Sequence, residues 1–150
     1  MYKMAAVQVR LVQDREIAYK AAIDGVDQAA NAARALIGDD ADREYFAVLH
    51  LNQRNKVVSA CIVSVGTVSA TLVHPREVFK SAILANASRI VLVHNHPSGD
   101  PSPSQEDWVI TGNLIDAGKI LGITICDHIV LGDKDYNSLR ELNPRLGWDE

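Results

Sequence analysis

The sequence predicts an α/β domain in which a mixed sheet lies between layers of helices, and three observations lead to this prediction. Helix-like and strand-like segments alternate along most of the 150 residues, which is typical of a sheet covered on both faces. Hydrophobic residues make up 47% of the chain and charged ones 23%, values that exclude a disordered tail or a coiled-coil rod. The length fits one domain that can bury its own core.

The first helix is expected over residues 16–37. Its apolar side chains recur at steps of four and three, which places them on one face: Ala22, Val26, Ala29, Ala33 and Leu36. We expect Asp14 to cap the start of this helix and Gly38 to end it. Together with the loop that follows, the helix forms an N-terminal segment, residues 1–41, ahead of the main domain, residues 42–150.

Two strands follow and are expected to pair as an antiparallel hairpin. Residues 45–51 are nearly all apolar, and residues 57–65 are rich in β-branched side chains. The polar residues 52–56 between them have the length of a hairpin turn. After Gly66, which ends or bulges the second strand, a short third strand is predicted over residues 67–73.

The remaining elements are predicted to alternate between helix and strand. They are a helix that opens at Pro75 behind a capping His74, a buried strand over residues 89–93, a helix over residues 104–121 that Gly122 ends, and a strand over residues 123–131. A last helical turn is expected over residues 136–142. Between the strand and helix at the centre lies a loop with three prolines, residues 95–103.

Charge and cysteine content narrow the function classes. The chain has 15 basic and 19 acidic residues, a net charge of −4, and therefore lacks the broad positive field that drives binding to nucleic-acid phosphates. No apolar run approaches the roughly 18 residues that span a bilayer, and no signal peptide opens the chain. Cys61 and Cys126 each lie in an apolar run and are expected to be buried thiols. These features favour the reducing cytoplasm.

The candidate site lies in the loop after the strand 89–93. His94 and His96 are two residues apart, so in an extended chain both imidazoles point to the same side. A catalytic zinc takes three protein ligands and keeps a position open for water. Asp107, in the first turn of the next helix, is the natural third ligand because the proline-rich loop can fold that turn back beside the histidines.

The same residues also fit other interpretations. Ser104 and Asp107 fit a capping box, which alone would explain both of them. Capping does not explain two histidines at same-face spacing beside a strand end, where α/β proteins form their ligand sites. The literal triplet His-Asn-His does not indicate a nuclease, since the residues that name that class are spread over a ββα unit. The His-x-Glu and Pro-Cys-x-x-Cys pattern of zinc deaminases is absent from the sequence.

The segment from His94 to Asp107 resembles the JAMM, or MPN+, metalloprotease motif, which is His-x-His, seven residues, Ser, two residues, Asp. The longer string HNHPSGD, followed by Pro103 and Ser104, is similar to the bacterial RadC family in particular. The strings PREVFK at residues 75–80 and DHIV at residues 127–130 agree with that resemblance. Members of the family usually carry a helix-hairpin-helix region, whereas here only one predicted helix precedes the domain, as in a short form of the family.

The resemblance implies a fold, a metal and a set of roles. It implies a three-layer α/β/α domain of the cytidine-deaminase type, with Zn²⁺ held by His94, His96 and Asp107. It implies that Glu44, at the start of the first core strand, is the general base and that Ser104 stabilises the oxyanion. The expected activity is then hydrolysis of a peptide or isopeptide bond by metal-activated water.

The sequence leaves two other functions open: an accessory or nucleic-acid-processing role in DNA repair, and a non-catalytic MPN scaffold. The expected partner is a peptide or protein substrate whose identity is unknown, and no membrane partner is expected. Direct contact with nucleic acid is doubtful, and a homo-oligomer is left open. The expected location is the bacterial cytoplasm.

The strand predicted over residues 123–131 contains two polar residues, Asp127 and His128. By alternation Asp127 shares the apolar face with Ile125 and Ile129, so it must accept hydrogen bonds or be turned outward by a bulge. We expect a structural role for it. His128 would then point away from that face and be structural or exposed rather than a ligand.

Overall fold

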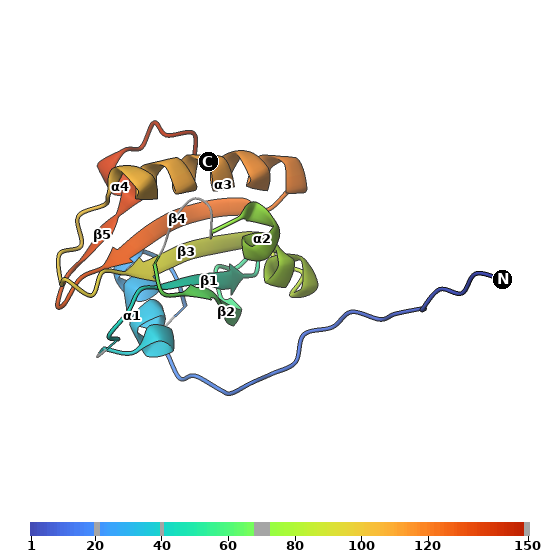
Figure 1. Cartoon of the computed structure of the whole chain (residues 1–150). Helices are drawn as coiled ribbons and strands as arrows, with labels where there is room; N and C mark the ends of the chain where they lie inside the picture. Colours follow the sequence, from blue (N-terminus) through green and yellow to red (C-terminus); the bar gives the residue numbers. More distant parts are fainter. Residues whose placement is uncertain (20–21, 40, 68–72, 149–150) are drawn as a thin grey trace.

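The computed structural model describes residues 1–19, 22–39, 41–67 and 73–148 of the chain (Figure 1). Within these residues the elements follow in the order α1 (Val26–Ile37), β1 (Tyr45–Leu51), β2 (Val57–Val65), α2 (Pro75–Leu84), β3 (Arg89–Asn95), α3 (Gln105–Leu121), β4 (Thr124–Leu131), β5 (Tyr136–Ser138) and α4 (Leu139–Leu142). No helix among these residues has both the length and the apolar character needed to cross a bilayer.

The strands form a single mixed sheet in the order β2-β1-β3-β4-β5. β1 pairs antiparallel with both β2 and β3, and β5 pairs antiparallel with β4. β3 and β4 are parallel, and α3 supplies the crossover that a parallel pair requires. The predicted α/β class, the mixed sheet and the antiparallel hairpin are therefore confirmed.

Helices cover both faces of the sheet, which gives the domain three layers (Figure 1). On one face α2 and α3 pack against side chains such as Phe46 and Leu92. On the other face the alanines of α1 pack against side chains such as Leu49 and Val93. The central strands β1 and β3 are thus buried on both sides, which explains why their sequences are almost continuously apolar. α1 therefore shares a core with the sheet. The boundary proposed between residues 41 and 42 stays a prediction.

The first helix begins later than the periodicity predicts. α1 starts at Val26 behind an extended Gly25, not near residue 16, and Asp14 does not cap it. The preceding residues are held by long-range contacts instead: the Tyr19 hydroxyl donates to the Val57 carbonyl at 3.0 Å, and the Ile23 amide donates to the Asn55 carbonyl at 3.0 Å. These bonds hold the backbone in a non-helical path, and tertiary contacts outweigh a weak helical pattern. The predicted end of the helix at Gly38 is confirmed.

Helix caps predicted from local sequence are present. The His74 side chain accepts a hydrogen bond from the Arg76 amide at the start of α2. Ser104 and Asp107 form both arms of a capping box on α3, and Gly122 ends that helix in a left-handed conformation. The free thiols of Cys61 and Cys126 are half-buried rather than buried.

Two further predicted elements lie near the edges of the sheet. The third strand proposed over residues 67–73 falls almost wholly on residues 68–72, outside the described residues. The helical turn predicted over residues 136–142 is two elements, because residues 136–138 pair with β4 as β5 and only residues 139–142 are helical.

A register shift in β4 overturns the expected face of that strand. Ile90 pairs with Ile125, but Val91 pairs with Asp127, so Cys126 is skipped. One extra residue reverses the alternation beyond it, and Ile125 and Ile129 consequently lie in opposite cores. The single apolar face predicted for β4 is therefore wrong.

Asp127, at that shift, has the structural role that the sequence suggested. Its carboxylate accepts hydrogen bonds from the Ser138 hydroxyl at 2.6 Å, from the His128 amide at 2.7 Å and from the Arg140 amide at 3.2 Å. Burial raises the pKa of this carboxyl, while these donors act in the opposite direction. The side chain thus ties the start of α4 to β4.

Candidate metal centre

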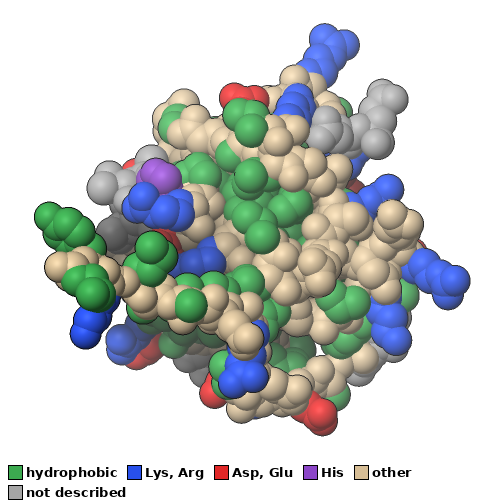
Figure 2. Space-filling model, turned by 90° about the vertical axis from the view of Figure 1, so that its right-hand side faces the viewer, with side chains coloured by type: hydrophobic (Ala, Val, Ile, Leu, Met, Phe, Trp, Pro, Cys, Tyr) green, Lys and Arg blue, Asp and Glu red, His purple; other side chains and the backbone are tan. Residues whose placement is uncertain are grey.

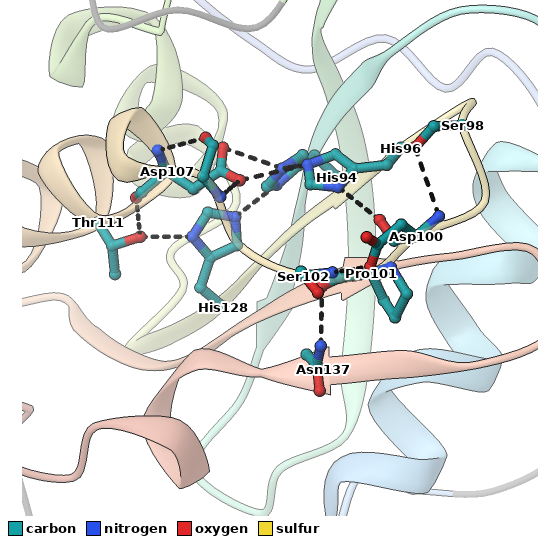
Figure 3. A network of polar contacts seen from close by, with 11 residues as sticks. His94, His96, Ser98, Asp100, Pro101, Ser102, Asp107, Thr111, His128 and Asn137 are labelled. Atoms are coloured by element: carbon teal, nitrogen blue, oxygen red, sulfur yellow. Dashed lines mark hydrogen bonds and ion pairs between the residues drawn. The ribbon is translucent and has the colours of Figure 1, made fainter.

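Three predicted ligands meet at the carboxyl end of β3 (Figure 3). His94 is the second-to-last residue of β3, His96 directly follows that strand, and Asp107 lies in the first turn of α3. The Nε2 atoms of the two histidines are 3.0 Å apart. His94 Nε2 is 3.2 Å from Asp107 Oδ1, and His96 Nε2 is 3.2 Å from Asp107 Oδ2. These ligand atoms lie within 4.8 Å of one another and could hold a metal ion.

The loop between the histidines and α3 is held by hydrogen bonds to β4, to the turn after β4 and to β5. The His96 amide donates to the Leu131 carbonyl at 2.9 Å, and the Asp133 amide donates to the Gly99 carbonyl at 3.0 Å. Asn137 of β5 donates through its side-chain amide to the Pro101 carbonyl at 2.9 Å. The loop that leads to Asp107 is therefore attached to the rest of the fold at three of its residues, His96, Gly99 and Pro101.

The hydrogen bond of His96 fixes which of its nitrogens can bind a metal. Its Nδ1 lies 2.8 Å from the backbone carbonyl of Asp100. A carbonyl can only accept, so Nδ1 carries the proton in the neutral ring. The lone pair of neutral His96 is consequently on Nε2, the atom that faces His94 and Asp107.

A longer chain of hydrogen bonds fixes His94. The Thr111 hydroxyl donates to the Asp107 backbone carbonyl at 2.7 Å, so its oxygen is left to accept from His128 Nδ1 at 2.6 Å. With its proton on Nδ1, His128 accepts at Nε2 from His94 Nδ1, 2.8 Å away. His94 therefore also directs the lone pair of Nε2 at the cluster. Such outer partners are what hold metal-binding histidines in one tautomer.

The atoms that face one another in this cluster are all acceptors, so a cation placed among them would stabilise the cluster. Burial by itself would raise the pKa of the Asp107 carboxyl, but the neighbouring imidazoles of His94 and His96 outweigh burial and hold that pKa well below its usual range. The ionised Asp107 in turn raises the pKa of His96. Two imidazole nitrogens and one carboxylate also match the ligand set of a catalytic zinc.

His128 and Thr111 lie behind the candidate ligand His94 in one hydrogen-bond chain, and the sequence did not indicate this place for either residue. Both are fully buried, at 0% exposure. By simple alternation His128 would point away from the face of Ile125, but the register shift at Cys126 places it on the face that His94 occupies. Burial holds the pKa of His128 well below its usual value, so this ring is neutral. One signal was available for Thr111, which follows Asp107 by four residues and so shares its face of α3.

Glu44 is half-buried directly before β1. Its charge contributes to the raised pKa of His96, which places the carboxylate within electrostatic reach of that ring. The side chain of Asn95 holds the backbone on both sides of Glu44: it accepts from the Tyr45 amide at 2.7 Å and donates to the Arg43 carbonyl at 3.0 Å. The residue between the two histidines therefore positions the predicted base.

Ser104 is exposed at the start of α3, and its hydroxyl oxygen accepts from the Asp107 amide at 3.1 Å. That bond uses the oxygen as an acceptor and leaves the hydroxyl proton able to donate. The roles given to Glu44 and Ser104, and those of the three ligands, stay predictions.

A cavity of about 330 Å³ opens beside His96. Its lining comes from the loop after His96, from the turn after β4 and from the end of α1. Arg34 of α1 donates to the carbonyls of Gly132 at 3.2 Å and Asp135 at 2.7 Å, which fixes the turn that forms one wall. The site thus has space for a bound group next to its more exposed histidine.

Comparison with known proteins gives two results. A family model described as RadC-like JAB domain matches residues 23–144. Among curated proteins, a UPF0758 protein of Desulforamulus reducens is 52% identical over 101 residues, 67% of this chain and 44% of that protein. A UPF0758 protein of Methanosarcina acetivorans is 50% identical over 99 residues, 66% of this chain and 43% of that protein. The chain therefore spans less than half the length of these relatives.

Proposed function

This chain belongs to the family of RadC-like JAB domains, and from that premise and the geometry of its site we propose that it is a zinc-dependent hydrolase of peptide or isopeptide bonds. The observation that carries the proposal is the convergence of three groups with fixed lone pairs. His94 and His96 present Nε2 to the Asp107 carboxylate at 3.2 Å each. A buried cluster of acceptors is costly without a cation, so the fold maintains a site that a divalent ion would stabilise.

His94, His96 and Asp107 would hold the ion. Zinc bound with three protein ligands acts as a Lewis acid and lowers the pKa of a bound water to about 7. JAB domains of the MPN+ type, which this chain resembles in its motif, supply the same residue types at the same spacing.

Glu44 would accept the proton of the attacking water and pass it to the departing amine. Its position supports this role, because its charge reaches His96 and Asn95 fixes the backbone around it. Ser104 would donate its hydroxyl proton to the oxygen on which negative charge develops. The cavity beside His96 would receive part of the substrate chain.

The test compares the wild-type chain with two variants after loading with zinc. Glu44→Gln is expected to abolish cleavage of a proteome-derived peptide library, read by mass spectrometry, while one zinc per chain remains bound. His96→Ala is expected to lose both zinc and cleavage. The control is Glu77→Gln, which changes an exposed glutamate that pairs with Lys80 on α2, and it should behave as wild type.

Other outcomes would replace this proposal. A wild-type chain that binds one zinc but cleaves nothing would favour a non-catalytic MPN scaffold. A chain that binds no divalent ion would remove the basis of the proposal. A gel shift with DNA that weakens as salt rises, in the absence of any cleavage, would favour the accessory role in DNA repair.

A further inference from the structure

Two hollows in the surface differ in what they offer a ligand. One is a groove beside β2, and Leu11 lines it together with Ile62 and Leu84. Figure 2 shows hydrophobic side chains gathered on the face from which the first residues of the chain project. This groove is therefore shared with the chain's own N-terminal segment. The other hollow is the cavity beside His96, whose lining includes charged side chains.

Arg34 of α1 brings a positive charge to the wall of the cavity beside His96. Ala33 and Leu36 of the same helix are buried in the core that α1 shares with Leu131 at the end of β4. Arg34 itself is half-buried. The packing of α1 on the sheet therefore sets where the guanidinium lies relative to the loop that carries His96.

The hydrogen bonds of Arg34 hold its guanidinium but do not use all of the donors. Nη1 donates to the carbonyls of Gly132 at 3.2 Å and Asp133 at 3.5 Å, and Nη2 donates to the carbonyl of Asp135 at 2.7 Å. Nε and one N–H of Nη2 are left without a partner among the residues that the structure describes. Those residues also form no ion pair with Arg34. The guanidinium is thus oriented but keeps donors for a ligand.

The open donors of Arg34 suit a carboxylate. Nε and Nη2 form one edge of the planar guanidinium, and such an edge can bind both oxygens of a carboxylate. Because backbone carbonyls already orient the group, little side-chain entropy is left to lose on binding. Asp39 and Asp133 also line the cavity, but both are exposed, so water and salt screen their charges more than that of half-buried Arg34.

We propose that Arg34 binds a carboxylate of the substrate, so that this chain acts on bonds that lie close to a free C-terminus or to an acidic side chain. Arg34 and His96 line the same cavity of about 330 Å³, which is near the lower end of the roughly 300–1,000 Å³ of ligand pockets and suits a residue next to the cleaved bond. Arg34 would determine specificity and take no part in proton transfer. This inference rests on the proposed hydrolase activity, but the binding of a carboxylate can be measured without cleavage.

The test measures binding to the metal-free chain with a chelator present, so that no metal ion can bind the carboxylate. The solution is kept at about pH 8, where an ordinary histidine is neutral. Acetyl-Gly-Gly is compared as the free acid and as the C-terminal amide by NMR titration. We expect the free acid to bind about ten-fold or more tightly, because only the acid can make the charge-assisted contact. The Nε–H resonance of Arg34 should shift with the acid and not with the amide.

Two variants assign this preference to Arg34. Arg34→Lys keeps the charge but lacks the planar edge, and it should lose most of the preference for the free acid. The matched control is Arg76→Lys, the same change at an exposed arginine of α2, and it should bind as wild type. The backbone amide resonances of Gly132 and Asp133 report whether Arg34→Lys keeps the turn. If they move, the comparison of acid with amide in the wild type decides.

Two further probes separate the sources of the carboxylate from other ligands. Tighter binding of acetyl-Gly-Gly acid than of acetyl-Gly-Asp amide would indicate a free C-terminus, and the reverse would indicate an acidic side chain. Equal affinity of the wild type for the acid and amide of acetyl-Gly-Gly overturns the proposal. So does tighter binding of acetyl-Gly-Lys amide than of both carboxylate probes, which would assign the cavity to a cation. A chain that prefers the carboxylate but cleaves nothing after zinc loading would remove the hydrolase activity and leave the carboxylate site in place.

Discussion

Two buried histidine sites lie near opposite ends of the strand pair β1–β3, and they differ in the groups that face the rings. His50 is opposite Ile90, near the start of β3, and its nitrogens lie 2.8 Å from the hydroxyls of Ser59 and Ser81. His94 is opposite Phe46, near the end of β3, and it faces His96 and Asp107. A hydroxyl can donate or accept, so the first site is satisfied by protein atoms alone.

This difference shows that burial of a histidine does not by itself indicate a ligand. His50 is 1% exposed and His94 is 0% exposed. Burial lowers the pKa of His50 to about 4, and its two hydroxyl partners suit a neutral ring. At the other end, Asp107 raises the pKa of His96, and the ring nitrogens there meet only acceptors. The chemistry of the partner group decides between a structural histidine and a metal-binding one.

The largest expected effect is the loss of metal binding in Asp107→Asn. The amide oxygen can still accept from the Ser104 amide and keep the start of α3, but the negative charge between the histidines is gone. Zinc affinity, measured by competition with a chromogenic chelator, should fall below detection. Asp127→Asn makes the same substitution at a half-buried carboxylate that accepts hydrogen bonds from protein donors, and it should retain zinc. Equal zinc affinity in Asp107→Asn and Asp127→Asn would contradict the proposed difference between these two carboxylates.

The second prediction concerns the stability of the metal-free chain in acid. The pKa of His50 is about 4 in the folded state against 6.5 for a free side chain, so the unfolded state binds more protons between these values. The free energy of unfolding should therefore fall as the pH drops from 6.5 to 4, by up to about 3 kcal/mol from this residue. Urea unfolding at several pH values with a chelator present measures the fall, and His50→Gln should show a shallower one. An identical pH dependence in both proteins would rule His50 out as the cause.

The smallest effect is expected from Thr111→Val, which keeps the shape of the side chain but removes the hydroxyl that accepts from His128. The His128 proton can then move to Nε2, which would reverse the tautomer of His94 and place a proton where the lone pair is needed. Metal affinity should fall by roughly 10- to 100-fold, the usual effect of removing such an outer partner.

The control for Thr111→Val is Ser81→Ala, which removes a hydroxyl from His50 and should leave metal affinity unchanged. The ¹⁵N shifts of the histidine rings report the tautomers directly. If His94 keeps its proton on Nδ1 in Thr111→Val, the hydrogen-bond chain does not set its tautomer.

The sequence predicts those parts of the site that depend on local rules. Alternation along an extended strand places His94 and His96 on one side, and the capping box places Asp107 in the first turn of α3. The start of α1 escapes prediction because the contacts of Tyr19 and Ile23 join distant segments. The side of β4 on which His128 lies could not be predicted, because the skipped residue Cys126 is recognised only from the pairing of β4 with β3. The positioning role of Asn95 likewise requires the pairing of β1 with β3.

The double use of Asp107 has a consequence for how the centre is assembled. One of its oxygens accepts the Ser104 amide as part of the helix cap, and both face a histidine. Ordinary helix formation therefore orients this acid before any ion arrives, and an incoming ion needs to reorganise little of the protein. A change that abolishes the cap would therefore disturb the start of α3 and the three candidate ligands in a single step.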